Sequence, residues 1–549
     1  MKIPIFCRIF VLGAGLCFWS AKIPSLHAET PASPENQVFQ FSVSGTCSEW
    51  ADHSTNRGTL YLWVPEECAR LRGLLILGFN VPEHRLVGHP VLREACRSQS
   101  LGLVWSAHTF WNFRKEAKGQ DAIQVGFLEK LLGQLADVSG YTEVKDVPWL
   151  PIGESGHLLM VDGLIEQRPE KCIAGIYLKN PGGRTNRTVP VLNSFGSAQE
   201  WGQMKKDLRT DWVENITNSY PRWVQNRAST DWPMSLLVEP ATGHFYCTEE
   251  MTRYVADYVK AAVQARLPEK EGEPLRAVRL EVGYLAALPV PGSEAGPPIP
   301  YAEAKPEEKK RGWYFTRDLA ERAQQMARVN WQADTALPLL VAGPGYEFFP
   351  FRLNSVTQME VSGDGTFGPK AELASVLPEG FIGAGEKLSQ PPGAVRMEWI
   401  CGSIAPAEDD GFRVSLDRTW RNGMDGGYMA ALFDGTDKVR RAVQPIHVKF
   451  LPNQAGEKQT ITWDPLPDVH AGAPPIPLTA RSSAGLAIRY FVVYGPAKIE
   501  GDKLILTPIP PRAKYPVEVA VTAWQWGRKS EPKVQTSDLV RQTFHILPP

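Results

Sequence analysis

Short apolar runs alternate with amphipathic helical patterns through residues 55–265 of this 549-residue chain. Residues 74–77 and 101–105 are almost wholly apolar, which is typical of strands that are buried on both faces of a sheet. Residues 121–136 and 251–263 carry their apolar side chains at helical spacing. Strands that alternate with helices in this way predict a mostly parallel sheet with helices on both faces.

The pattern changes after residue 267, where proline, glycine and charged residues become frequent. This composition indicates a linker, within which the sequence predicts a helix from Thr316 to Arg328 with Thr316 as its N-cap. From about residue 345 the chain has short alternating runs separated by glycine and proline. Such runs predict an all-β region.

The N-terminus has the layout of a cleaved secretory signal. Lys2 and Arg8 precede an apolar run over residues 9–19, and a polar stretch follows as far as Ala28. The run is too short to cross about 30 Å of hydrocarbon as an anchor, and no later segment is long and apolar enough. We therefore expect residues 1–28 to be removed from an exported protein without a transmembrane segment.

These patterns divide the chain into five predicted parts. In chain order they are a signal peptide (1–28), an α/β domain (29–270), a linker and extension with one helix (271–344), a β-rich domain (345–460) and a β-sandwich (461–549).

The composition excludes some function classes. Lys+Arg number 59 and Asp+Glu 60, so the chain lacks the positive field of a general nucleic-acid binder. No Cys-x-x-Cys pair is present, so nothing supports a zinc site. We expect no metal and no cofactor. Beyond the signal, the widely spaced cysteines predict one to three disulfides or buried thiols. These cysteines are Cys47, Cys68, Cys96, Cys172, Cys247 and Cys401.

The most specific motif is a serine between glycines where an apolar strand meets a helix. Residues 147–152 are strand-like, Gly153-Glu154-Ser155-Gly156 follows, and helical spacing begins at Leu158. A nucleophile elbow has this form because its strand-to-helix turn is so tight that the residues two before and two after the serine must be small. The alternative is that Ser155 is an ordinary helix N-cap in an inert or nucleotide-binding domain.

With this motif in its context, residues 55–265 resemble the α/β-hydrolase superfamily, over a little less than half of the chain. The resemblance implies a catalytic serine, acid and histidine in that chain order. It assigns these roles to Ser155, to Glu200 after a strand near residues 189–195, and to His244 after a strand at residues 235–238. Asp207 or Asp211 could replace Glu200 as the acid.

The resemblance also implies an oxyanion hole. Its donors would be the backbone N–H of Gly156 and that of Phe79 or Asn80, although the loop that holds them lacks the His-Gly-Gly-Gly stretch of many lipases. The residues expected to contact substrate are Trp111, His108 and His157.

The chain departs from the superfamily at His157, where glycine or alanine is expected. The imidazole must point away from the neighbouring strand or strain the elbow. This departure favours an alternative function, a non-catalytic cell-surface protein that binds glycan or protein on a degenerate hydrolase scaffold.

Residues 461–547 resemble the bacterial immunoglobulin-like modules of surface and secreted proteins. The resemblance implies a spacer or binding unit and an extracellular location. The segments that carry it are 461–469, 478–486, 490–497, 504–507 and 541–546.

Together these features predict a secreted serine hydrolase with β-rich accessory domains. We expect a carboxylesterase that acts through an acyl-enzyme on a small ester or on one linked to polysaccharide, with cell-surface or polysaccharide association. A peptidase on the same scaffold is a further alternative.

Overall fold

The structure is a computed structural model. It describes residues 37–47, 57–107, 120–179, 186–196, 229–239, 242–288, 295–328, 339–342, 356–358, 361–362, 365–377, 383–407, 411–419 and 426–549.

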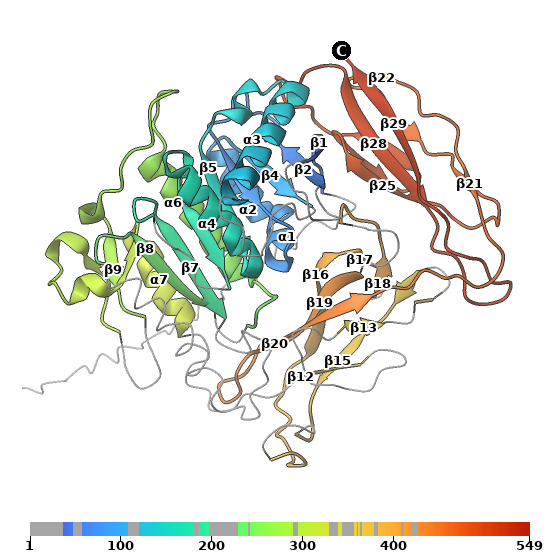
Figure 1. The fold of residues 1–549 in the computed structure, drawn as a ribbon. Coiled ribbons are helices and arrows are strands. Elements are labelled where there is room, and N and C mark those ends of the chain that lie inside the picture. The colour runs from blue at the N-terminus through green and yellow to red at the C-terminus, as the bar shows by residue number, and fades with distance from the viewer. Residues whose placement is uncertain are drawn as a thin grey trace, which may run out of the picture.

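The N-terminal part is built on one eight-stranded sheet with the strand order β1-β2-β4-β3-β5-β6-β7-β8 (Figure 1). The strands from β3 to β8 pair in parallel, and β1 and β2 add an antiparallel edge. The strand bounds are β1 Phe41–Thr46, β2 Arg57–Trp63, β3 Gly73–Leu77, β4 Leu101–Ser106, β5 Trp149–Glu154, β6 Gly175–Leu178, β7 Val191–Gly196 and β8 Met234–Glu239.

Helices cover both faces of this sheet, because successive strand residues point to opposite sides. Leu74 and Ile76 pack with α3 and α4 on one face, whereas Leu75 and Leu77 pack with α1, α2, α6 and α7 on the other. The mostly parallel, two-faced sheet predicted from the sequence is therefore confirmed. The helix bounds are α1 Val81–Val87, α2 Pro90–Ser98, α3 Gln120–Ser139, α4 Leu158–Gln167, α6 Glu249–Arg266 and α7 Arg317–Ala327.

The predicted helix after the α/β part is confirmed as α7. The hydroxyl of Thr316 caps it by accepting a hydrogen bond from the N–H of Leu319 at 3.2 Å. The structure adds a small sheet to this extension, formed by β9 (Tyr284–Ala286), β10 (Ile299–Pro300) and β11 (Gly312–Tyr314). Trp313 and Tyr314 are buried against β8, so this segment is more ordered than its charged composition predicted.

The rest of the described chain is all-β, as predicted, and forms several small sheets. Whether residues 461–547 are an immunoglobulin-like module stays a prediction. The strands up to residue 449 are β12 Leu339–Ala342, β13 Val356–Gln358, β14 Thr366–Phe367, β15 Lys370–Leu373, β16 Val395–Gly402, β17 Ile404–Pro406, β18 Phe412–Val414, β19 Gly426–Phe433 and β20 Ala442–Lys449. The later strands are β21 Ile461–Thr462, β22 Val469–His470, β23 Ile476–Pro477, β24 Arg481–Ser482, β25 Arg489–Tyr494, β26 Ala497–Glu500, β27 Lys503–Leu506, β28 Val517–Trp524 and β29 Val540–Leu547.

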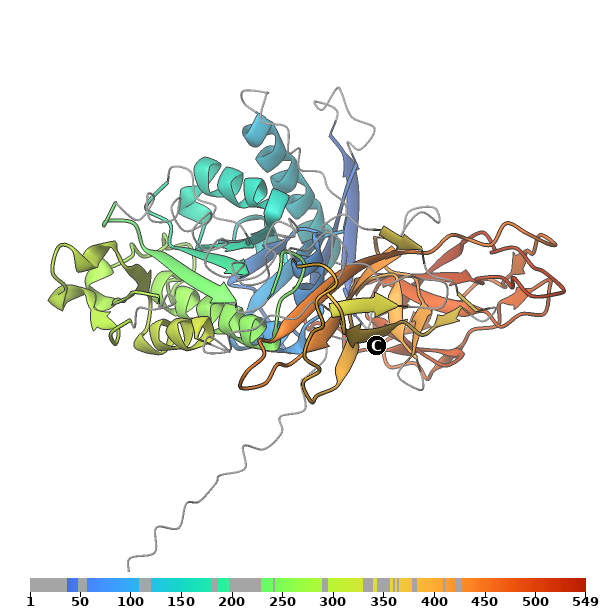
Figure 2. The same ribbon diagram turned by 90° about the horizontal axis from the view of Figure 1, so that it is seen from below.

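The β-rich parts lie beside the α/β part in both ribbon views (Figure 2). One buried side chain joins three of these regions: the guanidinium of Arg418 donates to the carbonyls of Gln37, Val492 and Val493. It also lies over the ring of Phe39, 4.9 Å from its centroid. The regions therefore share a packed interior.

The six cysteines beyond residue 28 are all buried and unpaired, which corresponds to the buried-thiol alternative. Burial raises the pKa of the Cys96 thiol to about 12, so this side chain behaves as a small apolar group. Among the described residues, no helix is long and apolar enough to span a membrane.

Candidate active site

The predicted site residues follow three parallel strands of the main sheet. Phe79 and Asn80 come after β3, Ser155 follows β5, and His244 follows β8. Because the carboxyl ends of parallel strands lie at one edge of a sheet, these loops share that edge.

Ser155 has the strained backbone that was expected for a nucleophile elbow. Its φ is 50°, a left-handed conformation that non-glycine residues rarely adopt. A Cβ on Gly153 would overlap the backbone carbonyl of His157, so the turn is as tight as the motif predicted. A 3-10 turn over Ser155–His157 leads directly into α4 at Leu158.

His244 lies at this elbow. Its Nε2 is 3.1 Å from Oε1 of Glu154, the residue directly before Ser155, and the two side chains are only 2% and 0% exposed. The structure thus brings residues about ninety positions apart into contact. The sequence patterns indicated no role for Glu154, although a glutamate that ends a wholly buried strand was a usable signal.

His157 is held by a second buried carboxylate. Its Nδ1 lies 2.9 Å from Oε2 of Glu83 in α1, and Oε1 of Glu83 accepts a hydrogen bond from the N–H of Glu154. The ring of Phe79 meets the imidazole edge-on at 4.9 Å between centroids. The bulk of His157 therefore points toward the loop after β3, and the elbow accommodates it. Its predicted contact with substrate stays a prediction.

Gly78 provides the space for this imidazole. A Cβ at residue 78 would overlap Nδ1 of His157 and a carboxylate oxygen of Glu83. We expect Gly78→Ala to lower the free energy of unfolding by about 1–3 kcal/mol, because an overpacked site must shift. Gly133→Ala is the matched control, since a Cβ there meets nothing within 4 Å and helix α3 should gain about 1 kcal/mol. Urea unfolding of both variants tests this, and equal stability would contradict it.

The loop after β3 is also tied to the elbow directly. The side-chain amide of Asn80 donates to the carbonyl of Glu154 at 2.8 Å, and Asn80 occupies the N-cap position of α1. The backbone N–H groups of Phe79, Asn80 and Gly156 remain predictions as oxyanion donors.

Several predicted residues lie outside the described chain. They are Glu200, the alternative acids Asp207 and Asp211, and the predicted substrate contacts Trp111 and His108. The last described residue of β7 is Gly196, four positions before Glu200. Among the described residues, no group of three or more His, Cys, Asp or Glu could hold a metal ion.

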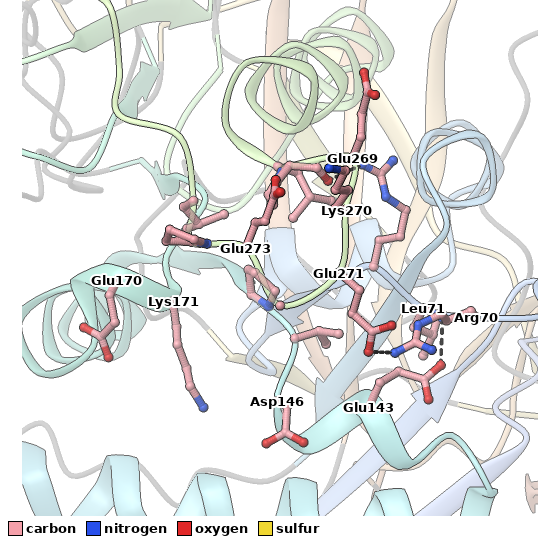
Figure 3. A pocket seen from close by; sticks show the side chains of 18 of the residues that line it. Arg70, Leu71, Glu143, Asp146, Glu170, Lys171, Glu269, Lys270, Glu271 and Glu273 are labelled. Carbon is pink, nitrogen blue, oxygen red and sulfur yellow. Dashed lines mark hydrogen bonds and ion pairs between the residues drawn. The ribbon is translucent and has the colours of Figure 1, made fainter.

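A cavity of about 710 Å³ lies at the opposite edge of the sheet (Figure 3). Its lining includes Arg70, Arg72, Glu143 and Lys171, which precede β3, β5 and β6, together with residues 267–275. Acidic and basic side chains are mixed there, and Arg70 pairs with Glu271. The cavity is therefore separate from the elbow.

The strand order, together with a strained serine after β5 and a histidine after β8, defines the N-terminal part as an α/β-hydrolase type of fold. No protein-family model matches the chain, and no curated protein matches it either.

Several solved structures that are similar to this chain are hydrolases. One is poly(aspartic acid) hydrolase-1 from Sphingomonas sp. KT-1, which is 11% identical, with 40% of this chain and 99% of that chain covered and a TM-score of 0.29. A poly(3-hydroxybutyrate) depolymerase from Bordetella parapertussis is 12% identical, with 42% and 92% covered and a TM-score of 0.27. An S-formylglutathione hydrolase from Agrobacterium tumefaciens is 14% identical, with 41% and 95% covered and a TM-score of 0.26. Because these scores are low, the fold assignment rests on the strand order.

Proposed function

We propose that this protein is a secreted serine hydrolase that cleaves carboxylic esters through an acyl-enzyme. The observation that carries the proposal is the strained Ser155 at the end of β5, with the buried His244 in contact with the adjoining Glu154. This histidine contacts the residue that directly precedes Ser155, and a serine nucleophile needs an imidazole base close by to be activated.

In the proposed mechanism Ser155 Oγ attacks the ester carbonyl carbon, and the ring of His244 takes the hydroxyl proton. The carboxylate of Glu154 at Nε2 stabilises the resulting imidazolium. The superfamily resemblance implies Glu200 as the acid of the triad, and in that case Glu200 has this stabilising role in place of Glu154. Backbone N–H groups of Gly156 and of Phe79 or Asn80 hold the oxyanion. Collapse expels the alcohol, which receives the proton from His244. Water then hydrolyses the acyl-serine by the same steps.

We propose a small or polysaccharide-linked ester as the substrate. The signal-like N-terminus and the β-rich regions support an exported enzyme whose accessory domains, one of them immunoglobulin-like, act as spacers or binding units. That plan is common among enzymes that degrade polymers, so the support is an analogy of architecture.

A fluorophosphonate probe tests the nucleophile. We expect the wild-type protein to be labelled at Ser155, and Ser155→Ala to lose the label completely, because phosphonylation needs the activated hydroxyl. Ser98→Ala, at the exposed end of α2, is the matched control and should label like wild type. Intact-protein mass spectrometry measures the adduct. Equal labelling of Ser155→Ala and wild type would refute the assignment.

The alternative function is non-catalytic binding of glycan or protein on the same scaffold. The observation that favours it is His157 at a position that the superfamily fills with glycine or alanine. A folded wild-type protein that takes up no probe would support this alternative, and a labelled one would count against it.

A further inference from the structure

The sheet formed by β13, β20, β19 and β16 uses one of its faces to contact the α/β part. Met429 and Ala431 of β19 point into the core of the β-rich region, whereas Ala430 and Leu432 pack with Val81 at the start of α1. In Figure 1, β16 lies close to α1, and the two elements are in contact. The face that contacts α1 thus lies beside the loops of the candidate active site.

The same face contacts the two residues that follow the candidate catalytic histidine. The ring of Phe245 meets the ring of His244 edge-on, with 5.1 Å between the ring centroids. The ring centroid of Tyr428 in β19 lies 5.4 Å from that of Phe245. Tyr246 is buried, and its hydroxyl donates to Oε2 of Glu398 in β16 at 3.0 Å. Burial raises the pKa of Tyr246 well above its ordinary value, so the phenol stays protonated as a donor.

Arg85 of α1 completes a partly buried network around this loop, in which Arg85 and Tyr246 are buried and the carboxylates of Glu398 and Glu249 are about one fifth exposed. Its side chain is 1% exposed, and its Nη2 lies 2.5 Å from Oε1 of Glu398. Its Nη1 donates a hydrogen bond to the carbonyl of Trp399. Its guanidinium carbon lies over the ring of Tyr246, 5.2 Å from the ring centroid. Its Nη2 also lies 3.6 Å from Oε1 of Glu249 at the start of α6. The network therefore connects α1, the loop after β8 and the β-rich region.

Such a network holds its members in one arrangement, because a carboxylate that moves leaves the buried guanidinium of Arg85 or the buried hydroxyl of Tyr246 without its partner. The loop that carries His244 is short, because β8 ends at Glu239 and the N-cap of α6 is already Thr248. Fixing Tyr246 therefore fixes the backbone two residues from the imidazole.

We propose that Glu398, Tyr246 and Arg85 form a clamp by which the β-rich region positions His244 for catalysis. The three are positioning residues that act through the loop, and this inference rests on the proposed hydrolase function. The clamp makes the β-rich region part of the active site, whereas the sequence predicted it only as an accessory domain.

Glu398→Gln and Tyr246→Phe are the test variants, since each keeps the shape of the side chain and removes one partner of the clamp. We expect either variant to lower kcat by about 10- to 100-fold with KM within about twofold of wild type, because a displaced base affects the reaction more than substrate binding. The double variant should lose little more than the worse single variant. Glu372→Gln, on the exposed side of β15, is the matched control and should keep wild-type kcat.

Hydrogen–deuterium exchange of residues 242–248 separates failure of the clamp from failure of the hydrolase proposal. We expect faster exchange there in Glu398→Gln than in Glu372→Gln, whether or not the protein turns over a substrate. Unchanged exchange in this segment would overturn the clamp. If the wild-type protein neither reacts with the probe nor hydrolyses esters while Glu398→Gln still loosens the loop, the hydrolase proposal fails and only the structural clamp remains. Faster exchange with unchanged kcat would overturn the positioning role.

Discussion

His244→Gln is expected to lower kcat for ester hydrolysis by roughly 10⁶-fold, the scale of loss when a serine hydrolase loses its base. An amide side chain does not take a proton from Ser155 at neutral pH, although it keeps a donor for the buried Glu154. The folded state should therefore survive while the reaction stops. Hydrolysis of a chromogenic ester measures kcat, and circular dichroism checks the fold.

His470→Gln is the matched control for this prediction, since His470 is exposed and lies in β22, far along the chain from the elbow. It should keep wild-type kcat. If His244→Gln keeps activity within tenfold of wild type, then His244 is not the base and another residue must activate Ser155.

Lys179→Met is expected to lower the free energy of unfolding by about 3–5 kcal/mol, because it leaves a buried carboxylate without its cation. Lys179 and Glu239 form an ion pair in which both side chains are 0% exposed. The ammonium of Lys179 also donates to Thr242 at 2.9 Å, and Glu239 accepts a hydrogen bond from the N–H of Thr248. The pair therefore anchors both ends of the loop that carries His244.

Chemical unfolding of Lys179→Met and of two further variants tests this prediction. The double variant Lys179→Met with Glu239→Leu should recover much of the lost stability, because neither charge then remains buried. Lys498→Met removes a partly exposed pair with Glu500 and should cost less than about 1 kcal/mol. If Lys179→Met costs no more than Lys498→Met, the buried pair does not stabilise the fold.

The sequence predicted the elements that depend on local patterns. The apolar runs at residues 74–77 and 101–105 became β3 and β4, and Thr316 caps α7 as expected. Glycine at residue 153 and the strained Ser155 follow from the tight turn. Each of these features depends on residues close together in the chain, so a single sequence contains the necessary information.

The ion-pair partners in the site could not be predicted in this way. Glu154 with His244, and Glu83 with His157, pair residues about 90 and 74 positions apart. The sequence showed that His157 was too large for its position but not where the imidazole would lie. Only the packing of the β3 loop against the elbow provides that space, at Gly78.

The sequence alone determined that the N-terminal part is a mostly parallel sheet with a serine on a sharp turn, because strand, turn and helix preferences are local. The tertiary structure decided which carboxylates contact the two histidines, and that β16 and β19 border the loop of His244. Those contacts join segments that are far apart in the chain, such as Tyr246 and Glu398, which are 152 positions apart. They form only when whole sheets and helices pack, and no local pattern encodes that geometry.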